Sequence, residues 1–232
     1  ICARGWQAES RKVFWPLLVW ADGSDEWLQR QRDFFRTIHP DRAGTWRVTA
    51  GTQTRTLQLT ADLSDSYAYA LDPLLEGWAV YPVTLEAASP YWAGAPVSAG
   101  PWSAGAGGVP FFPGPPFHIS SSMTLTSAQI TNPGDVDAWP VWSAWDELTS
   151  LTVGVSGRSI VVPFDLADGD RLVIGTDPRR PFATLNGVDV LAELGLQAYA
   201  PVPALGTAPL QIEAGGSGSV ACTITPQHFR AF

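Results

Sequence analysis

The sequence predicts a mainly β protein of two domains, the first of which carries one α-helix. Three observations lead to this prediction. Apolar and polar residues alternate along many short segments, one segment has helical spacing, and one uncharged segment separates two parts of the chain. Alternation with a period of two indicates half-buried strands, and spacing near 3.6 indicates an amphipathic helix. Half of the residues in 93–116 are Gly or Pro, so we expect a stiff linker there between domains at 1–92 and 117–232.

The first domain is predicted to be a sheet with one helix laid on it. The apolar stripe of the helix consists of Trp27, Leu28, Gln31, Phe34, Phe35 and Ile38. Ser24 is the expected N-cap, and His39-Pro40 ends the helix because the residue before proline is pushed out of helical geometry. Alternation predicts strands around Val13–Val19, Trp46–Val48, Leu57–Ala61 and Val83–Ala87.

The second domain is predicted to contain only strands and turns, as in a β-sandwich. Strands are expected at Leu151–Val155, Ile160–Phe164, Leu172–Ile174, Leu210–Ala214 and Val220–Ile224. Turns are expected at Gly157-Arg158, Asp168-Gly169 and Asn186-Gly187, and Gly215–Gly218 is expected to close a last hairpin. Cys222 is in phase with Val220 and Ile224, so its thiol is expected to be structural and to face the core.

Composition excludes several classes of function. The net charge is −8 and Lys12 is the only lysine, so clustered cations for nucleic-acid binding are lacking. The longest apolar runs fall short of the roughly 18 residues of a membrane span. Cys2 and Cys222 are the only cysteines, too few for a disulfide framework or a four-cysteine zinc site. The chain opens Ile1-Cys2-Ala3 and holds one methionine, Met123, so we expect that an N-terminal piece precedes it.

We predict no catalytic, cofactor-binding or metal-binding residue. His39, His118 and His228 lack further ligands at metal-binding spacing. Asp165, Asp168 and Asp170 lack the glycine and glutamate of a calcium loop and are expected in a solvated turn. Gly215–Ser219 approaches a nucleophile elbow, but its last residue is Ser and it joins two predicted strands. Paired glycosidase acids among 22 carboxylates stay open on sequence alone.

The 11 tryptophans have two explanations. Most of them lie in the first domain, where a core or a protein interface would use them. Trp139, Trp142 and Trp145 are close enough for two of them to face opposite sides of one strand. An exposed indole in a β-sandwich can also stack on a sugar ring. We favour a core and an interface over a sugar platform.

A series of short motifs runs through nearly the whole chain. In the first domain they are Glu9–Leu17, Phe34–Pro40, Gly44–Val48, Arg55–Leu59, Tyr81–Ala87 and Ser89–Trp92. In the second they are Asn132–Asp135, Ala138–Trp142, Gly157-Arg158, Leu172–Ile174, Thr184–Gly187 and Thr223–Pro226. In this order they resemble the minor tail proteins of actinobacterial siphophages, in the distal tail protein family.

The resemblance implies both a fold and a role. The first domain would be a belt domain, a split barrel with a helix, here without its first strands, and the second a galectin-like sandwich. The galectin sugar motif is absent, because His118–Ser121 does not match it and Asn132-Pro133-Gly134 lacks its arginine. Six copies would form a ring that joins the tail tube to the tail tip and docks fibres or receptor-binding proteins.

The resemblance also implies partners and a location. The partners would be copies of the chain itself, the tail tube protein, and proteins of the tail hub and tip. DNA would pass through an acidic lumen without specific binding. The location would be the virion tail tip, after assembly in the bacterial cytoplasm, where both cysteines stay reduced. A carbohydrate-binding module and a cell-wall hydrolase are the alternatives to this non-enzymatic role.

Overall fold

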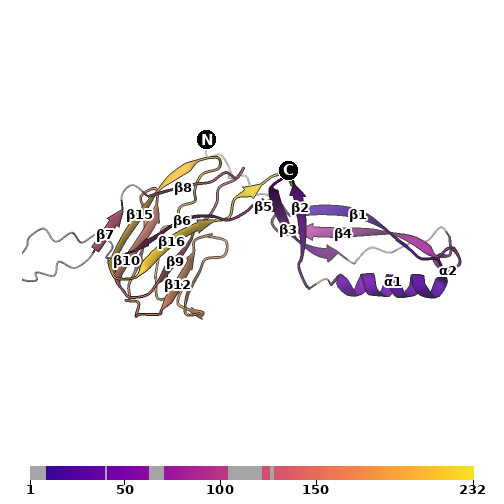
Figure 1. Cartoon of the computed structure of the whole chain (residues 1–232), viewed down its shortest axis with the longest axis horizontal. Coiled ribbons are helices and arrows are strands. Elements are labelled where there is room, and N and C mark those ends of the chain that lie inside the picture. Colours follow the sequence, from indigo (N-terminus) through magenta and orange to yellow (C-terminus); the bar gives the residue numbers. More distant parts are fainter. Residues whose placement is uncertain (1–8, 40, 63–70, 104–121, 126–127) are drawn as a thin grey trace, which may run out of the picture. The chain divides into compact units, whose positions relative to one another are not determined.

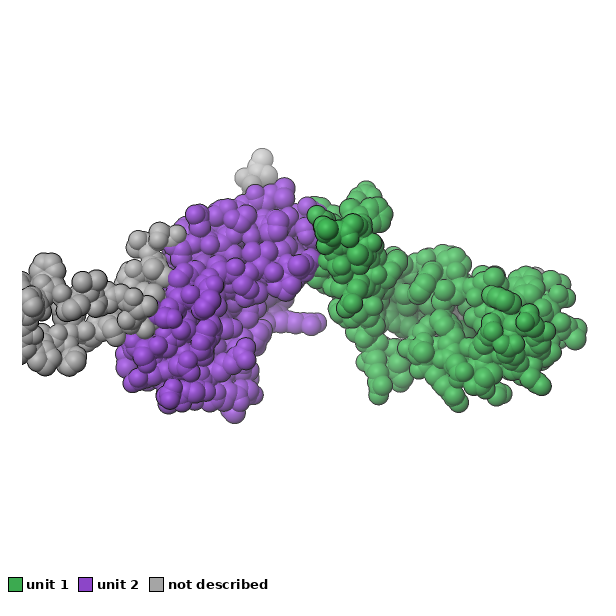
Figure 2. Space-filling model, viewed as in Figure 1, with its two compact units in different colours: residues 1–93, 229–232 green, residues 94–228 purple. Residues whose placement is uncertain are grey.

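The structure is a computed structural model that describes residues 9–39, 41–62, 71–103, 122–125 and 128–232. The chain divides into two compact units, coloured separately in Figure 2. Unit 1 comprises Ile1–Ala93 together with Phe229–Phe232, and unit 2 comprises Gly94–His228. Both units are built mainly from antiparallel strands, which confirms the predicted mainly β fold class.

Unit 1 combines one sheet with two helices (Figure 1). In chain order its elements are β1 (Arg11–Trp20), α1 (Ser24–Thr37), β2 (Gly44–Ala50), β3 (Gln53–Asp62), α2 (Pro73–Glu76), β4 (Trp78–Ala87) and β5 (Trp92–Ala93). The strands follow the order β1-β4-β3-β5, and β2 pairs with β3. All four strands predicted here from alternation are present as β1 to β4. The helix α2 was not predicted.

The helix α1 forms where its apolar stripe was predicted. Trp27 is buried, and Phe34 and Phe35 pack on a core of unit 1 that includes Tyr81. The predicted N-cap is wrong: Gly23 is the N-cap, and Ser24 is already helical, so its hydroxyl donates to the Leu74 carbonyl oxygen at 2.7 Å. The expected end is confirmed, because Thr37 closes the helix and the backbone is extended at the next residue.

Unit 2 is a sandwich of two sheets around one core. Its strands are β6 (Val97–Ser103), β7 (Ser122–Leu125), β8 (Gln129–Thr131), β9 (Val141–Trp145), β10 (Leu148–Val155), β11 (Arg158–Val162), β12 (Arg171–Gly175), β13 (Phe182–Leu185), β14 (Val188–Asp189), β15 (Thr207–Gly216) and β16 (Ser219–Ile224). The short strand β17 (Gln227–His228) follows them and belongs to neither sheet of the sandwich. One sheet has the order β11-β10-β15-β7, with β8 paired to β15. The other has the order β14-β13-β12-β9-β16-β6. The predicted sandwich is confirmed.

The predicted hairpin between β15 and β16 is wrong. β15 pairs with β10 in one sheet, and β16 pairs with β9 in the other, so Gly215–Gly218 carries the chain from sheet to sheet. The corner is held by the Glu147 carbonyl oxygen, which accepts from the backbone N–H groups of Ser217 and Gly218 at 2.9 and 2.7 Å. Gly216 takes φ 113 there, a value that side chains disfavour. Apolar and polar residues alternate in both strands, as they would in a hairpin. The alternation therefore does not distinguish a hairpin from a connection between two sheets.

Part of the expected linker is a strand. Val97–Ser103 form β6, which pairs with β16, because Val97 and Ala99 supply the apolar contacts that attach it to the core of unit 2. Residues 104–116 of that segment lie outside the described residues. The turn expected at Gly157-Arg158 is centred one residue earlier, since Ser156 and Gly157 take φ of 51 and 80. The turn at Asn186-Gly187 is confirmed, with positive φ at both residues.

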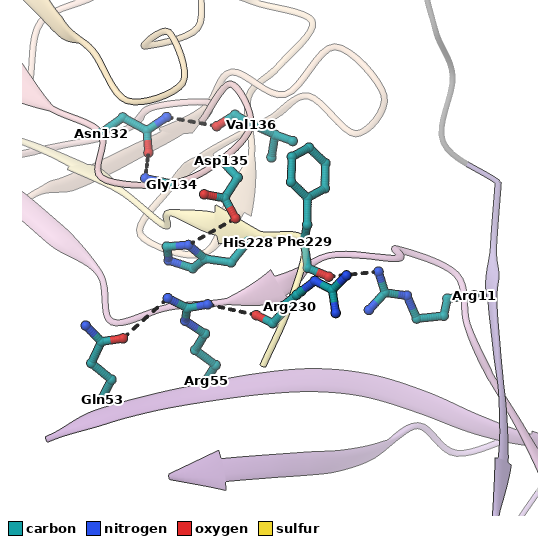
Figure 3. Close-up of polar contacts among 10 residues, drawn as sticks. All are labelled: Arg11, Gln53, Arg55, Asn132, Gly134, Asp135, Val136, His228, Phe229 and Arg230. Atoms are coloured by element: carbon teal, nitrogen blue, oxygen red, sulfur yellow. Dashed lines mark hydrogen bonds and ion pairs between the residues drawn. The ribbon is translucent and has the colours of Figure 1, made fainter. Parts of the chain in front are cut away.

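The residues Phe229–Phe232 belong to unit 1, although the chain reaches them through unit 2. Arg11 Nη2 donates to the Phe229 carbonyl oxygen at 3.0 Å, and Arg55 Nη1 donates to that of Arg230 at 2.8 Å (Figure 3). The ring of Phe229 packs edge-on against Tyr91, with 5.9 Å between centroids. These contacts attach the segment to unit 1.

Candidate protein-interaction surface

Strands β1 and β4 form a ribbon with two apolar faces, of which α1 covers one. The face toward α1 carries odd-numbered residues, including Leu17, Val19, Ala79, Tyr81 and Val83. Successive side chains of a strand point to opposite faces, so the even-numbered residues lie on the other face. That second face is therefore presented away from the helix (Figure 1), except at Trp20, where the Arg30 guanidinium of α1 lies over the ring, 5.4 Å from its centroid.

The residues of this second face are large and apolar. We call it the outer face and define it by Phe14, Pro16, Leu18, Trp20, Trp78, Val80 and Pro82. The antiparallel register sets Trp20 opposite Trp78 and Leu18 opposite Val80. The exposed fractions are 65% for Phe14, 58% for Leu18 and 54% for Trp20. Apolar side chains gathered like this on one face, with only part of each buried, are typical of an interaction surface.

The helix α2 adds a second group of exposed apolar side chains. Asp72 caps it by accepting from the Leu74 N–H, Pro73 fills the first turn, and Gly77 ends it with φ 72. The sequence Asp72-Pro73 followed by Gly77 carries a recognisable start and stop, so local pattern could have found this helix. Leu71, Leu74 and Leu75 are all exposed, Leu75 to 84%.

A pocket of about 360 Å³ lies in unit 1 on the side of α1. Its lining comes from the last turn of α1, from the segment between α1 and β2, and from β1 to β4: Trp15, Phe34, Thr37, Ile38, His39, Arg42, Gly44, Thr45, Trp46, Leu59, Ala61, Val83 and Leu85. Trp15 and Trp46 stack with 6.2 Å between centroids and 8° between planes. Trp92 supports Trp46 edge-on from behind, so the indole wall of the pocket is fixed by packing.

Two of the three histidines lie within the described residues, His39 in unit 1 and His228 in unit 2. His39 is at the rim of the pocket, where its Nδ1 accepts from the Asp41 N–H at 3.1 Å. His228 lies in unit 2 with its Nδ1 3.7 Å from an Asp135 carboxylate oxygen (Figure 3). His118 and Cys2 lie outside the described residues. Within the described ranges no three His, Cys, Asp or Glu side chains form a group that could hold a metal ion.

Asp170, Cys222 and the tryptophans of β9 occupy positions that the fold of unit 2 explains. Asp170 accepts from the Asn186 side chain and the Ala167 N–H, and these bonds lower the pKa of its carboxyl. Cys222 faces the core as predicted, and burial raises the pKa of its thiol to about 12. Trp142 is buried whereas Trp145, three residues on in β9, points to the opposite face, as expected.

Asn132 is used entirely by the fold of unit 2. Its side chain is fully buried, its Oδ1 accepts from the Gly134 N–H, and its Nδ2 donates to the Val136 carbonyl oxygen (Figure 3). The same Nδ2 also donates to the carbonyl oxygens of Val202 and Pro203. The Asn132-Pro133-Gly134 motif therefore holds a turn in place.

No protein-family model and no curated protein sequence matches this chain. Among solved structures it is similar to the Dit protein (gp 19.1) of phage SPP1, described as a paradigm of the hub adsorption apparatus in phages that infect Gram-positive bacteria. The identity is 12%, the TM-score is 0.60, and the match covers 95% of this chain and 80% of that chain. The chain has the fold of this Dit protein.

A second similarity is to a chain of the phage P2 baseplate in its activated conformation with Ca, with a TM-score of 0.44 and 11% identity. It covers 92% of this chain and 78% of that chain. The assignment of a Dit-like fold rests on the SPP1 protein. Neither α1 nor α2, the helices within the described residues, is long and apolar enough to cross a membrane.

Proposed function

We propose that this chain is a structural subunit of a phage tail tip. Six copies form a ring that joins the tail tube to the tip and docks fibres or receptor-binding proteins, and the chain catalyses no reaction. The observation that carries the proposal is the outer face of the β1–β4 ribbon, which belongs to a unit with the fold of a phage Dit protein.

The outer face supports a role inside an assembly. Burying a large apolar side chain fully stabilises an association by about 1.5–3 kcal/mol, and half-exposed side chains give about half of that. Phe14, Leu18, Trp20, Trp78 and Val80 together thus supply several kcal/mol when a neighbouring protein covers them. In a monomer these side chains stay exposed to water, so gathering them on one face does not stabilise it.

The proposal extends to partners and location. The tail tube protein and the hub or tip proteins adjoin the ring, in a siphophage of the actinobacterial type. The tail assembles in the host cytoplasm and ends in the virion. DNA passes the ring without specific binding, because the subunit has a net charge of −8 and an acidic lumen repels phosphate.

Negative-stain imaging and light scattering test ring formation directly. We expect the purified chain at high concentration to give six-fold rings in negative-stain images and the mass of six subunits by light scattering. Leu18→Asp combined with Val80→Asp should abolish the rings while the far-UV circular dichroism stays unchanged. A wild-type chain that stays monomeric at every concentration, and also when mixed with isolated tail tubes, would contradict the proposal.

Trp145 favours glycan binding by the sandwich as a second candidate function. It lies on the face of β9 away from the core, and the register sets it beside Arg171 of β12 and Ser219 of β16. An indole with neighbouring hydrogen-bonding groups is what stacking on a sugar requires. Titration with host cell-wall glycan should then quench tryptophan fluorescence in the wild type and not in Trp145→Ala. Equal traces for both proteins would remove this candidate.

A further inference from the structure

We propose that α2 of one copy docks into the pocket of unit 1 in the next copy. The inserted group consists of Leu71, Leu74 and Leu75, which we call the leucine knob. This inference rests on the proposed ring and names one contact that closes it.

The knob stands on a rigid base. Ser24 Oγ donates to the Leu74 carbonyl oxygen, and the Ala21 N–H donates to that of Gly77 at 2.8 Å. Gly77 itself lies so close to the chain that a Cβ on it would be 2.7 Å from the Ala21 carbonyl oxygen. α2 is thus held against the start of α1, so its backbone loses little further freedom when the leucines bind.

The pocket fits the knob in size and chemistry. A cavity of about 150 Å³ with apolar walls holds a benzene molecule, so one of about 360 Å³ has room for two leucine side chains. Trp15, Trp46 and Ile38 supply apolar walls. Such a pocket gains most from apolar groups, which release its water without leaving hydrogen bonds unmade.

Charges at the two sites are complementary. Glu76 directly follows the leucines on α2 and is exposed. Arg42 is at the rim of the pocket and is also exposed. When the leucines enter the pocket, this carboxylate and this guanidinium come together at the edge of the contact, where opposite charges fix orientation.

The knob of a chain cannot reach the pocket of the same chain. Ser24, the first residue of α1, contacts α2, whereas Phe34, Thr37 and Ile38 near its end line the pocket. A helix of 14 residues is about 20 Å long. The two sites therefore lie at opposite ends of α1 (Figure 1). A knob at one end and a pocket at the other make a heterologous contact, which repeats from copy to copy and closes into a ring when the rotation permits.

Cysteine cross-linking tests the pairing of the two sites. In a Cys2→Ser background, where Cys222 is buried, Leu75→Cys and Thr45→Cys place one thiol on the knob and one at the pocket. Under mild oxidation the protein with both substitutions should give a ladder of covalent oligomers. An equal mixture of the two single variants should give only dimers, because each has one of the two sites. Leu196→Cys with Thr45→Cys is the control, because Leu196 is a fully exposed leucine of unit 2.

A charge exchange tests the orientation. Glu76→Arg and Arg42→Glu alone should each weaken self-association, and the protein with both should recover most of it. Leu75→Asp should weaken it by roughly tenfold to a hundredfold, as expected for the loss of one buried leucine. The readout is the dissociation constant from sedimentation equilibrium.

The outcomes separate the inference from the proposed function. If rings form in the wild type, and Leu75→Asp leaves them unchanged or the cysteine pair gives no ladder, the docking is overturned while the ring stands. If the wild type does not self-associate and the cysteine pair stays monomeric, both the docking and the ring are overturned.

Discussion

Pro16 of β1 lies directly opposite Pro82 of β4 in the antiparallel register. Neither residue has a backbone N–H, so this pair is a non-hydrogen-bonded pair, and the ladder bonds come from the alternate residues. Those alternate residues are the ones whose side chains face α1. The even-numbered residues of β1, with side chains on the outer face, therefore direct their backbone groups away from β4, toward the edge of the ribbon.

Replacing Pro16 should expose that edge. Within the described residues β1 pairs with β4 alone, and Pro16→Val adds an N–H that points away from β4. Edge strands with unbroken N–H and C=O rows recruit further strands, and proline is a common guard against this. We expect Pro16→Val to aggregate faster on gentle heating, as followed by light scattering. Pro178→Val, at an exposed turn of unit 2, should aggregate like the wild type.

Lowering the apolarity of the outer face should affect assembly more than folding. Leu18 and Val80 lie opposite each other and are each about half exposed. The double change Leu18→Thr with Val80→Thr keeps residues suited to strands, so unfolding in urea should shift by less than about 1 kcal/mol. Ring formation should require a higher protein concentration. Val161→Thr, also half exposed but in unit 2, should leave both quantities unchanged.

Two glycines with similar backbone angles should respond differently to alanine. Gly77 and Gly51 take φ of 72 and 60, which costs an alanine about 1–2 kcal/mol at either position. At Gly77 the new Cβ also meets the Ala21 carbonyl oxygen, whereas at Gly51 it meets open space. We expect Gly77→Ala to lower the free energy of unfolding of unit 1 clearly more than Gly51→Ala. Equal losses would mean that α2 is not held against Ala21.

The stability of unit 2 should fall at high pH through Cys222. Its pKa is raised by burial from 9.0 to about 12 in the folded state. Above about pH 9 the unfolded thiol loses its proton while the folded one keeps it, so the unfolded state binds fewer protons and stability falls as pH rises toward 12. The expected slope from this group is about 1.4 kcal/mol per pH unit.

Urea unfolding of the wild type and Cys222→Ala at a series of pH values measures this slope. The difference between the two proteins should narrow between about pH 9 and 12, and a constant difference would contradict the burial effect. At neutral pH the native thiol should also resist aromatic disulfide reagents, which should react with it once the chain is unfolded.

Local pattern accounts for many of the helices and strands, but not for which strands pair with each other. Trp27, Phe34 and Phe35 mark α1, and alternation marks β2, β3, β10 and β12, because each of these segments has one apolar side. The N-cap was predicted one residue too late, because Gly23 is also a favourable N-cap residue and the Ser24 hydroxyl is used by the Leu74 carbonyl oxygen instead. The connection between β15 and β16 depends on long-range pairing with β10 and β9, which a single sequence does not encode in its period.

The outer face could not be assigned from sequence because β1 is apolar on both sides. Val13, Leu17 and Val19 alternate as a core strand would, but Phe14, Leu18 and Trp20 between them are equally apolar. The hydrophobic pattern alone therefore does not indicate whether the odd-numbered or the even-numbered residues face the core. Only the position of α1 on the odd-numbered face shows which set is left over.

The attachment of Phe229–Phe232 by Arg11 and Arg55 makes unit 2 an insertion within unit 1. Along the sequence, unit 2 is complete at His228, whereas unit 1 also needs Phe229–Phe232, which follow it. Two covalent connections, at residues 93–94 and 228–229, therefore join the units and share any pulling force between them, where an ordinary pair of tandem domains has one.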